Sequence, residues 1–173
     1  MHKLLILPII AFTLAGCNIF STPSKPSAPP AIPAPLGTSG EEIPAPKNTG
    51  STLNLSSQGL TQVTQDVFKK THITSLDVSN NNLTGALPAE IRHLQNLTTL
   101  DASNNQMTGV PAEIGQLKNL QTLDLSNNRL TGLPYELGNL KNLKTLNISG
   151  NQYSELDLSV IQESLPKNVT IIK

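Results

Sequence analysis

Residues 97–119 read LTTLDASNNQMTGVPAEIGQLKN and are followed directly by residues 120–142, LQTLDLSNNRLTGLPYELGNLKN. The second stretch repeats the first position by position at a spacing of 23 residues. Apolar side chains recur at the same seven positions of both stretches, and asparagine recurs at the ninth, as Asn105 and Asn128. A fixed period of this length is typical of a solenoid, in which each repeat forms one coil and successive coils stack.

The same pattern extends in both directions. The preceding unit, residues 73–96, contains one extra residue and so has a period of 24. The following unit begins at Leu143 and loses the pattern after Leu156, and an incomplete first unit has Gln58 where the others have asparagine. We therefore expect an amino-terminal capping repeat, a set of full repeats and a carboxy-terminal cap over residues 51–72, 73–156 and 157–173.

This spacing of leucines with a recurring asparagine resembles the leucine-rich repeat family, in its plant-type and bacterial versions. The resemblance implies an α/β solenoid: an arc with a parallel β-sheet on the concave face and short helical or 3-10 turns on the convex face. It also implies that the asparagines form a structural ladder, satisfying backbone groups where each coil turns away from its strand. The ladder residues are Asn81, Asn105, Asn128 and Asn151.

Leucines at alternate positions, as in Leu123-Asp124-Leu125, predict a short strand with apolar side chains inward and polar ones outward. A single coil would leave both flanks of its apolar side chains in water, so neighbouring coils must complete the burial. The equivalent leucines of successive coils are then expected to lie one above another. These leucines are Leu76, Leu100, Leu123 and Leu146.

A Pro-x-Glu-[Ile/Leu]-x-x-Leu segment follows each predicted strand and predicts a short helical turn on the convex side, with its glutamate near the positive end. These segments begin at Pro88, Pro111 and Pro134. The period is lost after Leu156. Residues 158–165 are expected to form one or two helical turns and residues 169–172 a last strand, which together cover the final apolar face.

The outward positions of the predicted strands line the concave face, where such repeats usually bind their ligands. They form polar columns, including a row of three aspartates about 4.8 Å apart if the strands are parallel. One interpretation of this row is a cation site, since calcium prefers oxygen ligands; the other is carboxylates bonded to Ser and Thr hydroxyls, and we assign no metal. The candidate ligand-binding residues are Asp77, Thr99, Asp101, Ser103, Thr122, Asp124, Ser126 and Arg129.

Composition and motifs argue against two classes of function. Twelve Lys and Arg balance twelve Asp and Glu, so the chain lacks the excess of positive charge that nucleic-acid binding requires. The sequence contains no Gly-x-Ser-x-Gly elbow, no His-Glu-x-x-His and no phosphate loop. We therefore expect a monomer with no catalytic residues, no enzyme activity and no cofactor.

The amino terminus indicates export. Residues 1–16 combine Lys3, an apolar run of 11 residues and a small-residue end, which is the shape of a secretory signal peptide. Eleven apolar residues are too few for a transmembrane helix, which needs about 20. Residues 17–50 follow, with eight prolines among Ser, Ala, Thr and Gly, and this composition predicts a disordered linker.

The end of the signal, Leu14-Ala15-Gly16-Cys17, resembles the lipobox of bacterial lipoproteins, and Cys17 is the only cysteine of the chain. The resemblance implies cleavage before Cys17 and attachment of fatty acyl chains to it, which would anchor the protein in a membrane. The residue after the lipidated cysteine resembles that of outer-membrane lipoproteins, because it is Asn18 and not the aspartate that favours retention in the inner membrane. In a Gram-negative organism we therefore expect the outer membrane as the location. The alternative is an ordinary secretory signal with a chance cysteine.

Two functions remain. The first is a lipid-anchored module of the bacterial cell envelope that binds a protein or glycan on its concave face. The second is a passive structural lipoprotein of the envelope without a selective ligand. The second is favoured by the lack of aromatic side chains in the polar columns, because binding hot spots are enriched in Trp, Tyr and Arg. Arg129 and Tyr135 are the nearest exceptions.

Overall fold

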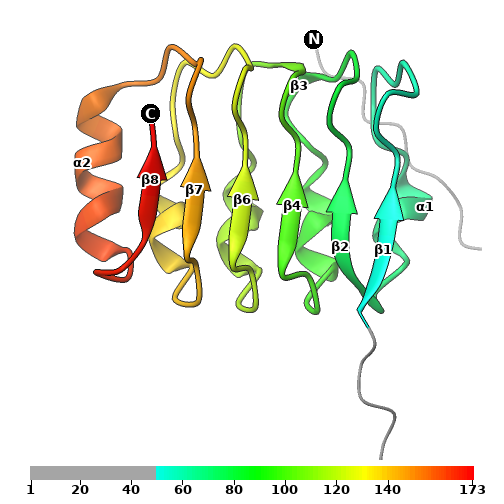
Figure 1. Cartoon of the computed structure of the whole chain (residues 1–173), viewed down its shortest axis with the longest axis horizontal. Helices are drawn as coiled ribbons and strands as arrows, with labels where there is room; N and C mark the ends of the chain where they lie inside the picture. The colour runs from blue at the N-terminus through cyan, green and yellow to red at the C-terminus, as the bar shows by residue number, and fades with distance from the viewer. Residues whose placement is uncertain (1–49) are drawn as a thin grey trace, which may run out of the picture. The chain divides into compact units, whose positions relative to one another are not determined.

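The computed structural model describes residues 50–173, which form a solenoid of stacked coils (Figure 1). Each full coil contributes one short strand to a single parallel sheet, and the caps contribute the two edge strands. The order across the sheet is β1-β2-β4-β6-β7-β8. These strands are β1 (Ser51–Asn54), β2 (Ile73–Asp77), β4 (Thr99–Asp101), β6 (Thr122–Asp124), β7 (Thr145–Asn147) and β8 (Thr170–Ile172).

The register of this sheet confirms the predicted stack of leucines. Leu76 pairs with Leu100, Leu100 with Leu123, and Leu123 with Leu146. Each of the four is at most 1% exposed. Because side chains alternate between the two faces of a strand, this register places the flanking polar residues in columns on the opposite face.

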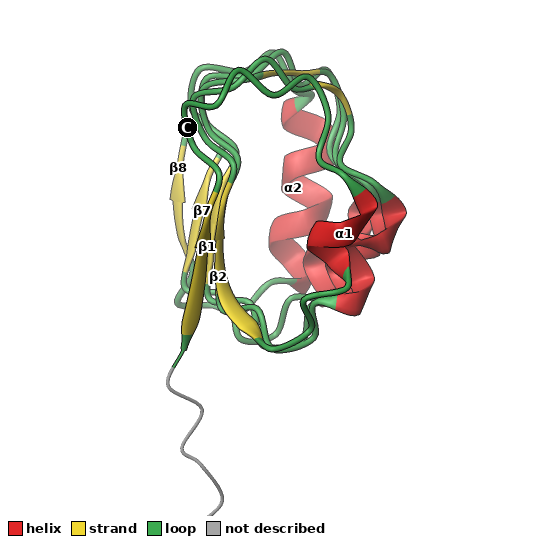
Figure 2. Ribbon diagram, turned by 90° about the vertical axis from the view of Figure 1, so that its right-hand side faces the viewer, coloured by secondary structure: helices red, strands yellow, loops and turns green. Residues whose placement is uncertain are grey.

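The side of each coil opposite the sheet is helical, as Figure 2 shows along the stack. Three 3-10 helices lie there: η1 (Ala89–His93), η2 (Ala112–Gln116) and η3 (Tyr135–Asn139). Each begins directly after its proline, which has an extended backbone and is the residue preceding the helix rather than its first residue. The prediction of short helical turns on the convex side is therefore confirmed.

A second, two-stranded parallel sheet was not predicted. It consists of β3 (Thr84–Gly85) and β5 (Gln106–Met107), which lie in the turns after the asparagine ladder. Two residues of each strand are too few to produce a recognisable alternation of polar and apolar side chains, so the sequence carries no signal for this sheet.

The two ends of the stack are closed differently. At the amino-terminal end, the short helix α1 (Gln65–Phe68) buries Val67 and Phe68, and the sequence pattern did not predict it. Gln58 is exposed and does not extend the ladder into this cap.

At the carboxy-terminal end, α2 (Glu155–Ser164) and β8 supply the expected helix and last strand. The buried side chains of α2 are Leu158 and Ile161. Its amino terminus is capped by Ser154, whose hydroxyl accepts a hydrogen bond from the Asp157 N–H at 3.4 Å. None of the helices within residues 50–173 has the length and apolarity needed to cross a bilayer.

Candidate functional site

The concave face is the side of the six-stranded sheet that faces away from the leucine core, toward the viewer of Figure 1. Its aspartate row is in register: Asp77 lies beside Asp101, Asp101 beside Asp124, and Asp124 beside Asn147. All four side chains are half-buried. The predicted row of carboxylates is therefore present on neighbouring strands.

Each carboxylate of the row is held by its own coil. Oδ1 of Asp101 accepts hydrogen bonds from the backbone N–H of Ser103 at 3.0 Å and from its hydroxyl at 2.7 Å. Oδ1 of Asp124 accepts the same two bonds from Ser126, at 2.9 and 2.6 Å. These bonds fix one oxygen of each aspartate and leave the other directed to a neighbour or a ligand.

Asn147 occupies the fourth place of the row and makes the same local bonds. Its Oδ1 accepts from the N–H of Ser149 at 3.2 Å and from the Ser149 hydroxyl at 2.8 Å. Its Nδ2 also donates to Oδ2 of Asp124 at 2.9 Å. Asn54 lies in register with Asp77 at the other end of the row and accepts the same two bonds from Ser56, so an amide replaces the carboxylate at both ends of the row.

Two predicted contact residues are less accessible than expected. Ser103 and Ser126 are 7% and 6% exposed, because their hydroxyls turn back to the aspartates two residues earlier. They support the carboxylate row and offer little surface to a ligand. Thr99 and Thr122, in contrast, are half-buried and lie in register beside each other.

Arg129 was assigned to the concave face from the sequence, and the structure places its backbone outside the strands of that face. It comes after the ladder residue Asn128, beyond the end of β6, and its backbone N–H donates to the carbonyl of Met107 in β5 at 2.8 Å. Its side chain is exposed. The turn after the ladder carries Arg129 beside the second sheet, which the sequence pattern did not reveal.

A column of equivalent residues, one from each coil, follows the carboxyl ends of the strands and has a structural role that we did not predict. Asn80, Asn104 and Asn127 have φ angles of 54°, 54° and 52°. This left-handed conformation is accessible mainly to glycine and asparagine, which explains Gly150 at the fourth position of the column. The Nδ2 of Asn127 also donates to Oδ1 of Asn104 at 3.1 Å, linking two coils.

The asparagine ladder is present and continuous. Oδ1 of Asn81 accepts from the N–H groups of Gln58 and Leu60, each at 3.0 Å, and its Nδ2 donates to carbonyls of its own and the preceding coil. Asn105 and Asn128 repeat this pattern, and both are 8% exposed. Asn151 also follows it but is half-buried. Their role within the fold is structural.

A second ladder lies at the opposite end of the strands. The Nδ2 groups of three exposed asparagines donate to a carbonyl of the preceding coil at 2.8 to 2.9 Å. Its signal in the sequence is an asparagine directly before the first leucine of a unit. The three residues are Asn96, Asn119 and Asn142.

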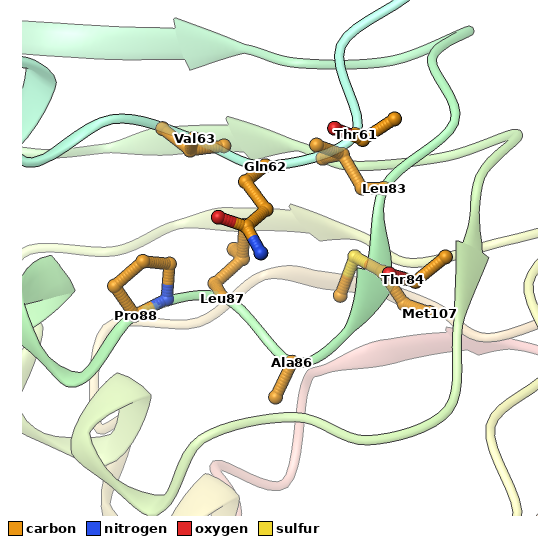
Figure 3. Close-up of a pocket in the computed structure, with 9 residues that line it drawn as sticks. All are labelled: Thr61, Gln62, Val63, Leu83, Thr84, Ala86, Leu87, Pro88 and Met107. Atoms are coloured by element: carbon orange, nitrogen blue, oxygen red, sulfur yellow. The ribbon is translucent and has the colours of Figure 1, made fainter.

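A pocket of about 240 Å³ lies away from the concave face, between the amino-terminal cap and the turn that contains the extra residue of unit 73–96. In Figure 3, the amide of Gln62 points toward Leu87, and Met107 lies on the side opposite Pro88. The lining has no ionisable side chain. The pocket can accept an apolar group but provides no general acid or base.

Neither a metal centre nor a catalytic cluster was assigned from the sequence. Among residues 50–173, no group of three or more His, Cys, Asp and Glu side chains is arranged to hold a metal ion. The aspartate row is too flat to converge on one point. Cys17 and the linker lie outside the described residues.

Comparison with known proteins gives one consistent assignment. A leucine-rich repeat family profile matches residues 51–107, and a two-copy form of the repeat matches residues 95–136 and 118–160. No curated protein matches the chain by sequence.

Three solved structures illustrate the likeness. A leucine-rich repeat protein of Leptospira interrogans is 32% identical over 70% of this chain and 36% of its own, with a TM-score of 0.59. A plant peptide hormone receptor, RGFR1 in complex with RGF2, is 32% identical over 72% of this chain and 20% of its own, also with a TM-score of 0.59. An internalin of Listeria monocytogenes is 26% identical over 64% of this chain and 31% of its own, with a TM-score of 0.56.

The chain spans only about a fifth to a little over a third of the length of these three proteins. The likeness therefore concerns the repeat domain and not the whole of any of them. The stacked leucines, the asparagine ladder and the profile matches over residues 51–160 agree, and the chain belongs to the leucine-rich repeat family.

Proposed function

We propose that this protein is a non-catalytic binding module of the bacterial cell envelope, anchored by lipid at Cys17, whose concave face binds a partner protein. The observation that carries the proposal is the row of Asp77, Asp101 and Asp124 on neighbouring strands, with one oxygen of each already fixed by the backbone. Side chains held in this way lose little conformational entropy when a ligand binds.

The charge of the concave face favours a particular class of partner. Its strand positions in residues 50–173 carry three carboxylates and no lysine or arginine. The flanking Thr99 and Thr122 hydroxyls can donate or accept hydrogen bonds. A protein surface rich in lysine, arginine or hydrogen-bond donors is complementary to this arrangement, and such complementarity raises association rates and specificity.

The similar proteins agree with a protein ligand. The plant receptor with a TM-score of 0.59 was solved with RGF2 bound. Another similar structure, that of PEPR1 with AtPEP1, is 30% identical over 64% of this chain, with a TM-score of 0.54. A glycan ligand is the other class left open by the polar composition of the face, and the experiment below distinguishes the two.

A variant that removes charge from the concave face tests its role in binding. Asp101→Asn with Asp124→Asn removes two charges but keeps the oxygen that accepts from the following serine, as Asn147 does naturally. At residue 124 it also removes the acceptor of the bond from Asn147, so the melting temperature of the variant is measured as well. We expect crosslinking on intact cells, followed by mass spectrometry, to recover a neighbouring protein with the unmodified chain and to recover much less of it with this variant.

The outcomes of this experiment are distinct. Loss of the protein neighbour in a variant with an unchanged melting temperature supports the proposal. An unchanged set of neighbours would instead favour the passive structural lipoprotein, in agreement with the absence of aromatic side chains from the concave face. Retention of the chain on purified envelope glycan, with no protein neighbour, would replace the protein partner by a glycan.

The anchor is tested separately, because it rests on the sequence around Cys17. We expect the chain expressed in a bacterial host to incorporate labelled palmitate and to partition into the detergent phase. Cys17→Ser is a clean control, since Cys17 is the only thiol of the chain. Equal labelling and partitioning of the two proteins would rule out lipidation at Cys17 without bearing on the binding face.

A further inference from the structure

A second hollow lies outside the six-stranded sheet, at the carboxy-terminal end of the repeat stack. It is an open groove of about 420 Å³ lined by the turns of two successive coils and by the first turn of α2. Two of these turns contain a Thr-Gly pair, in which Gly109 and Gly132 carry no side chain and leave the groove open. None of its lining residues belongs to the concave face.

The groove combines an apolar surface with an exposed aromatic ring. Val110, Leu133 and Pro134 contribute apolar side chains to its lining. Tyr135 stands at its edge and is 60% exposed, one of four large hydrophobic side chains that are exposed within residues 50–173. An exposed tyrosine offers a flat face to which an aliphatic chain or a cation can bind.

Two carboxylates complete the lining. Glu136 is exposed and Asp157 is half-buried, and no lysine, arginine or histidine is part of the groove. The ion pairs among the described residues are elsewhere, between Lys69 and Asp66 and between Lys173 and Glu155. Neither groove carboxylate accepts a hydrogen bond from another residue of 50–173.

Helix ends explain why these charges are stable here without a counter-ion. Glu136 lies in the first turn of η3 and Asp157 in the first turn of α2, where the helix dipole favours negative charge. That dipole does not explain why both side chains line one groove. A Cβ atom added to Gly132 would lie 3.6 Å from Oδ2 of Asp157, so this carboxylate is close to the turn that forms the groove.

We propose that this groove binds a basic segment of a partner protein, in which an arginine or lysine directs its cationic end to Glu136 and Asp157 and packs its aliphatic stem against Tyr135. The charge of the lining is complementary to such a side chain, and the apolar turns match its stem. The groove and the concave face share no residue, so the two binding surfaces are independent.

The chain provides its own optical probe for this site. It has two tyrosines and no tryptophan, so in the Tyr153→Phe variant of the full chain Tyr135 is the only tyrosine. We use the peptide acetyl-Gly-Leu-Arg-Leu-Gly-amide and a matched peptide in which citrulline, which has nearly the same shape without the charge, replaces arginine. Neither peptide fluoresces in the tyrosine region.

The arginine peptide is expected to change the fluorescence of Tyr135 in a saturable way. The citrulline peptide is expected to bind about two- to tenfold more weakly, as the loss of one or two exposed ion pairs implies. Glu136→Gln with Asp157→Asn is expected to lower the affinity for the arginine peptide by a similar factor and to weaken its dependence on salt. Asp101→Asn with Asp124→Asn serves as the control and leaves this binding unchanged.

Several results would overturn the proposal: equal affinity of the two peptides, no saturable change with millimolar arginine peptide, or unchanged affinity in the groove variant. Loss of binding in the Asp101 and Asp124 control would also overturn it, because the basic peptide would then occupy the concave face. If Asp157→Asn unfolds the chain by removing a charge from α2, Glu136→Gln alone gives the same test, since its side chain is exposed.

Discussion

Oδ1 of Asn105 accepts a hydrogen bond from the backbone N–H of Leu83, in the preceding coil, at 3.0 Å. The Nδ2 of the same side chain donates to the carbonyls of Val78, Ala102 and Ser103 at 3.1 to 3.2 Å. One amide therefore satisfies a donor and three acceptors from two coils. The three carbonyls each accept a second hydrogen bond, from Asn81, Asn128 and the N–H of Asn80, whereas the N–H of Leu83 has Asn105 as its acceptor.

Replacing this amide tests the ladder. We expect Asn105→Ala to lower the free energy of unfolding by about 2 to 3 kcal/mol, because the buried N–H of Leu83 loses its acceptor and a buried polar group left without a partner costs about 1 to 3 kcal/mol. Chemical denaturation measures the difference. Asn119→Ala is the matched control: its amide makes one exposed bond between coils, to the carbonyl of Gln95, and its loss costs about 1 kcal/mol or less. Equal losses in the two variants would contradict this assignment.

The leucine stack makes a second prediction. Leu123 is 0% exposed and lies between Leu100 and Leu146. Leu123→Asp buries an unpaired charge and is expected to abolish cooperative unfolding. Leu123→Ala keeps the site apolar and is expected to remain folded, with a loss of about 2 to 5 kcal/mol. Circular dichroism during heating distinguishes the two, and a melt of Leu123→Asp like that of the unmodified chain would refute the register.

The close approach of neighbouring helical turns makes a third prediction. A Cβ atom at Gly115, in η2, would overlap the carbonyl oxygen of Glu136 in η3, which is backbone and cannot move aside alone. Gly115→Ala is therefore expected to cost about 1 to 3 kcal/mol, the usual range for overpacking. Gly109→Ala is the control, because its Cβ would lie 3.9 Å from that of Ala86, an ordinary contact. Thermal melts of similar midpoint for the two variants would count against this packing.

The environment of Tyr153 predicts a dependence on alkaline pH. Burial raises the pKa of its hydroxyl above 10.0, the Glu155 carboxylate adds to this, and the Lys173 ammonium opposes it in part. Because the folded state resists ionisation, the stability from Tyr153 is complete below the unfolded pKa of about 10 and is lost as the pH rises through the higher folded pKa.

Two measurements check this prediction. In the Tyr135→Phe variant Tyr153 is the only tyrosine, so its ionisation is followed by tyrosinate absorbance, with a midpoint expected above that of the denatured chain. The free energy of unfolding is expected to fall as the pH rises above about 10, and to fall less in Tyr153→Phe. A midpoint equal to that of the denatured chain would show that the hydroxyl is not in a buried environment.

Some features of the concave face could not be predicted because they depend on hydrogen bonds within the turns that follow the strands. Ser103 and Ser126 occupy outward positions of the repeat, but their hydroxyls bond to Asp101 and Asp124 and leave them almost buried. Arg129 directly follows a ladder residue, and its backbone N–H donates to the carbonyl of Met107 in the second sheet. The alternation of inward and outward side chains along a strand does not apply to these residues, because they lie beyond the ends of the strands.

The sequence by itself determined the period, the approximate places of the strands, the leucines that stack between full repeats and the four asparagines of the ladder, although Leu156, which continued the pattern, is 77% exposed in α2. These features are encoded by the spacing of residue types within one unit and repeated in the next, so they can be read without knowing any distant contact. The order of the strands follows as well, because each coil can pack only against its neighbours in the chain.

Only the tertiary structure decided which polar groups are accessible and where hollows form. The apolar pocket depends on how the amino-terminal cap meets the turn with the extra residue, and the acidic groove depends on α2 bringing Asp157 beside the coil that carries Tyr135 and Glu136. Both arise where the repeat meets a cap. The physical reason is that a cap does not follow the period, so its contacts with the last regular coil are set by packing and not by the repeated pattern.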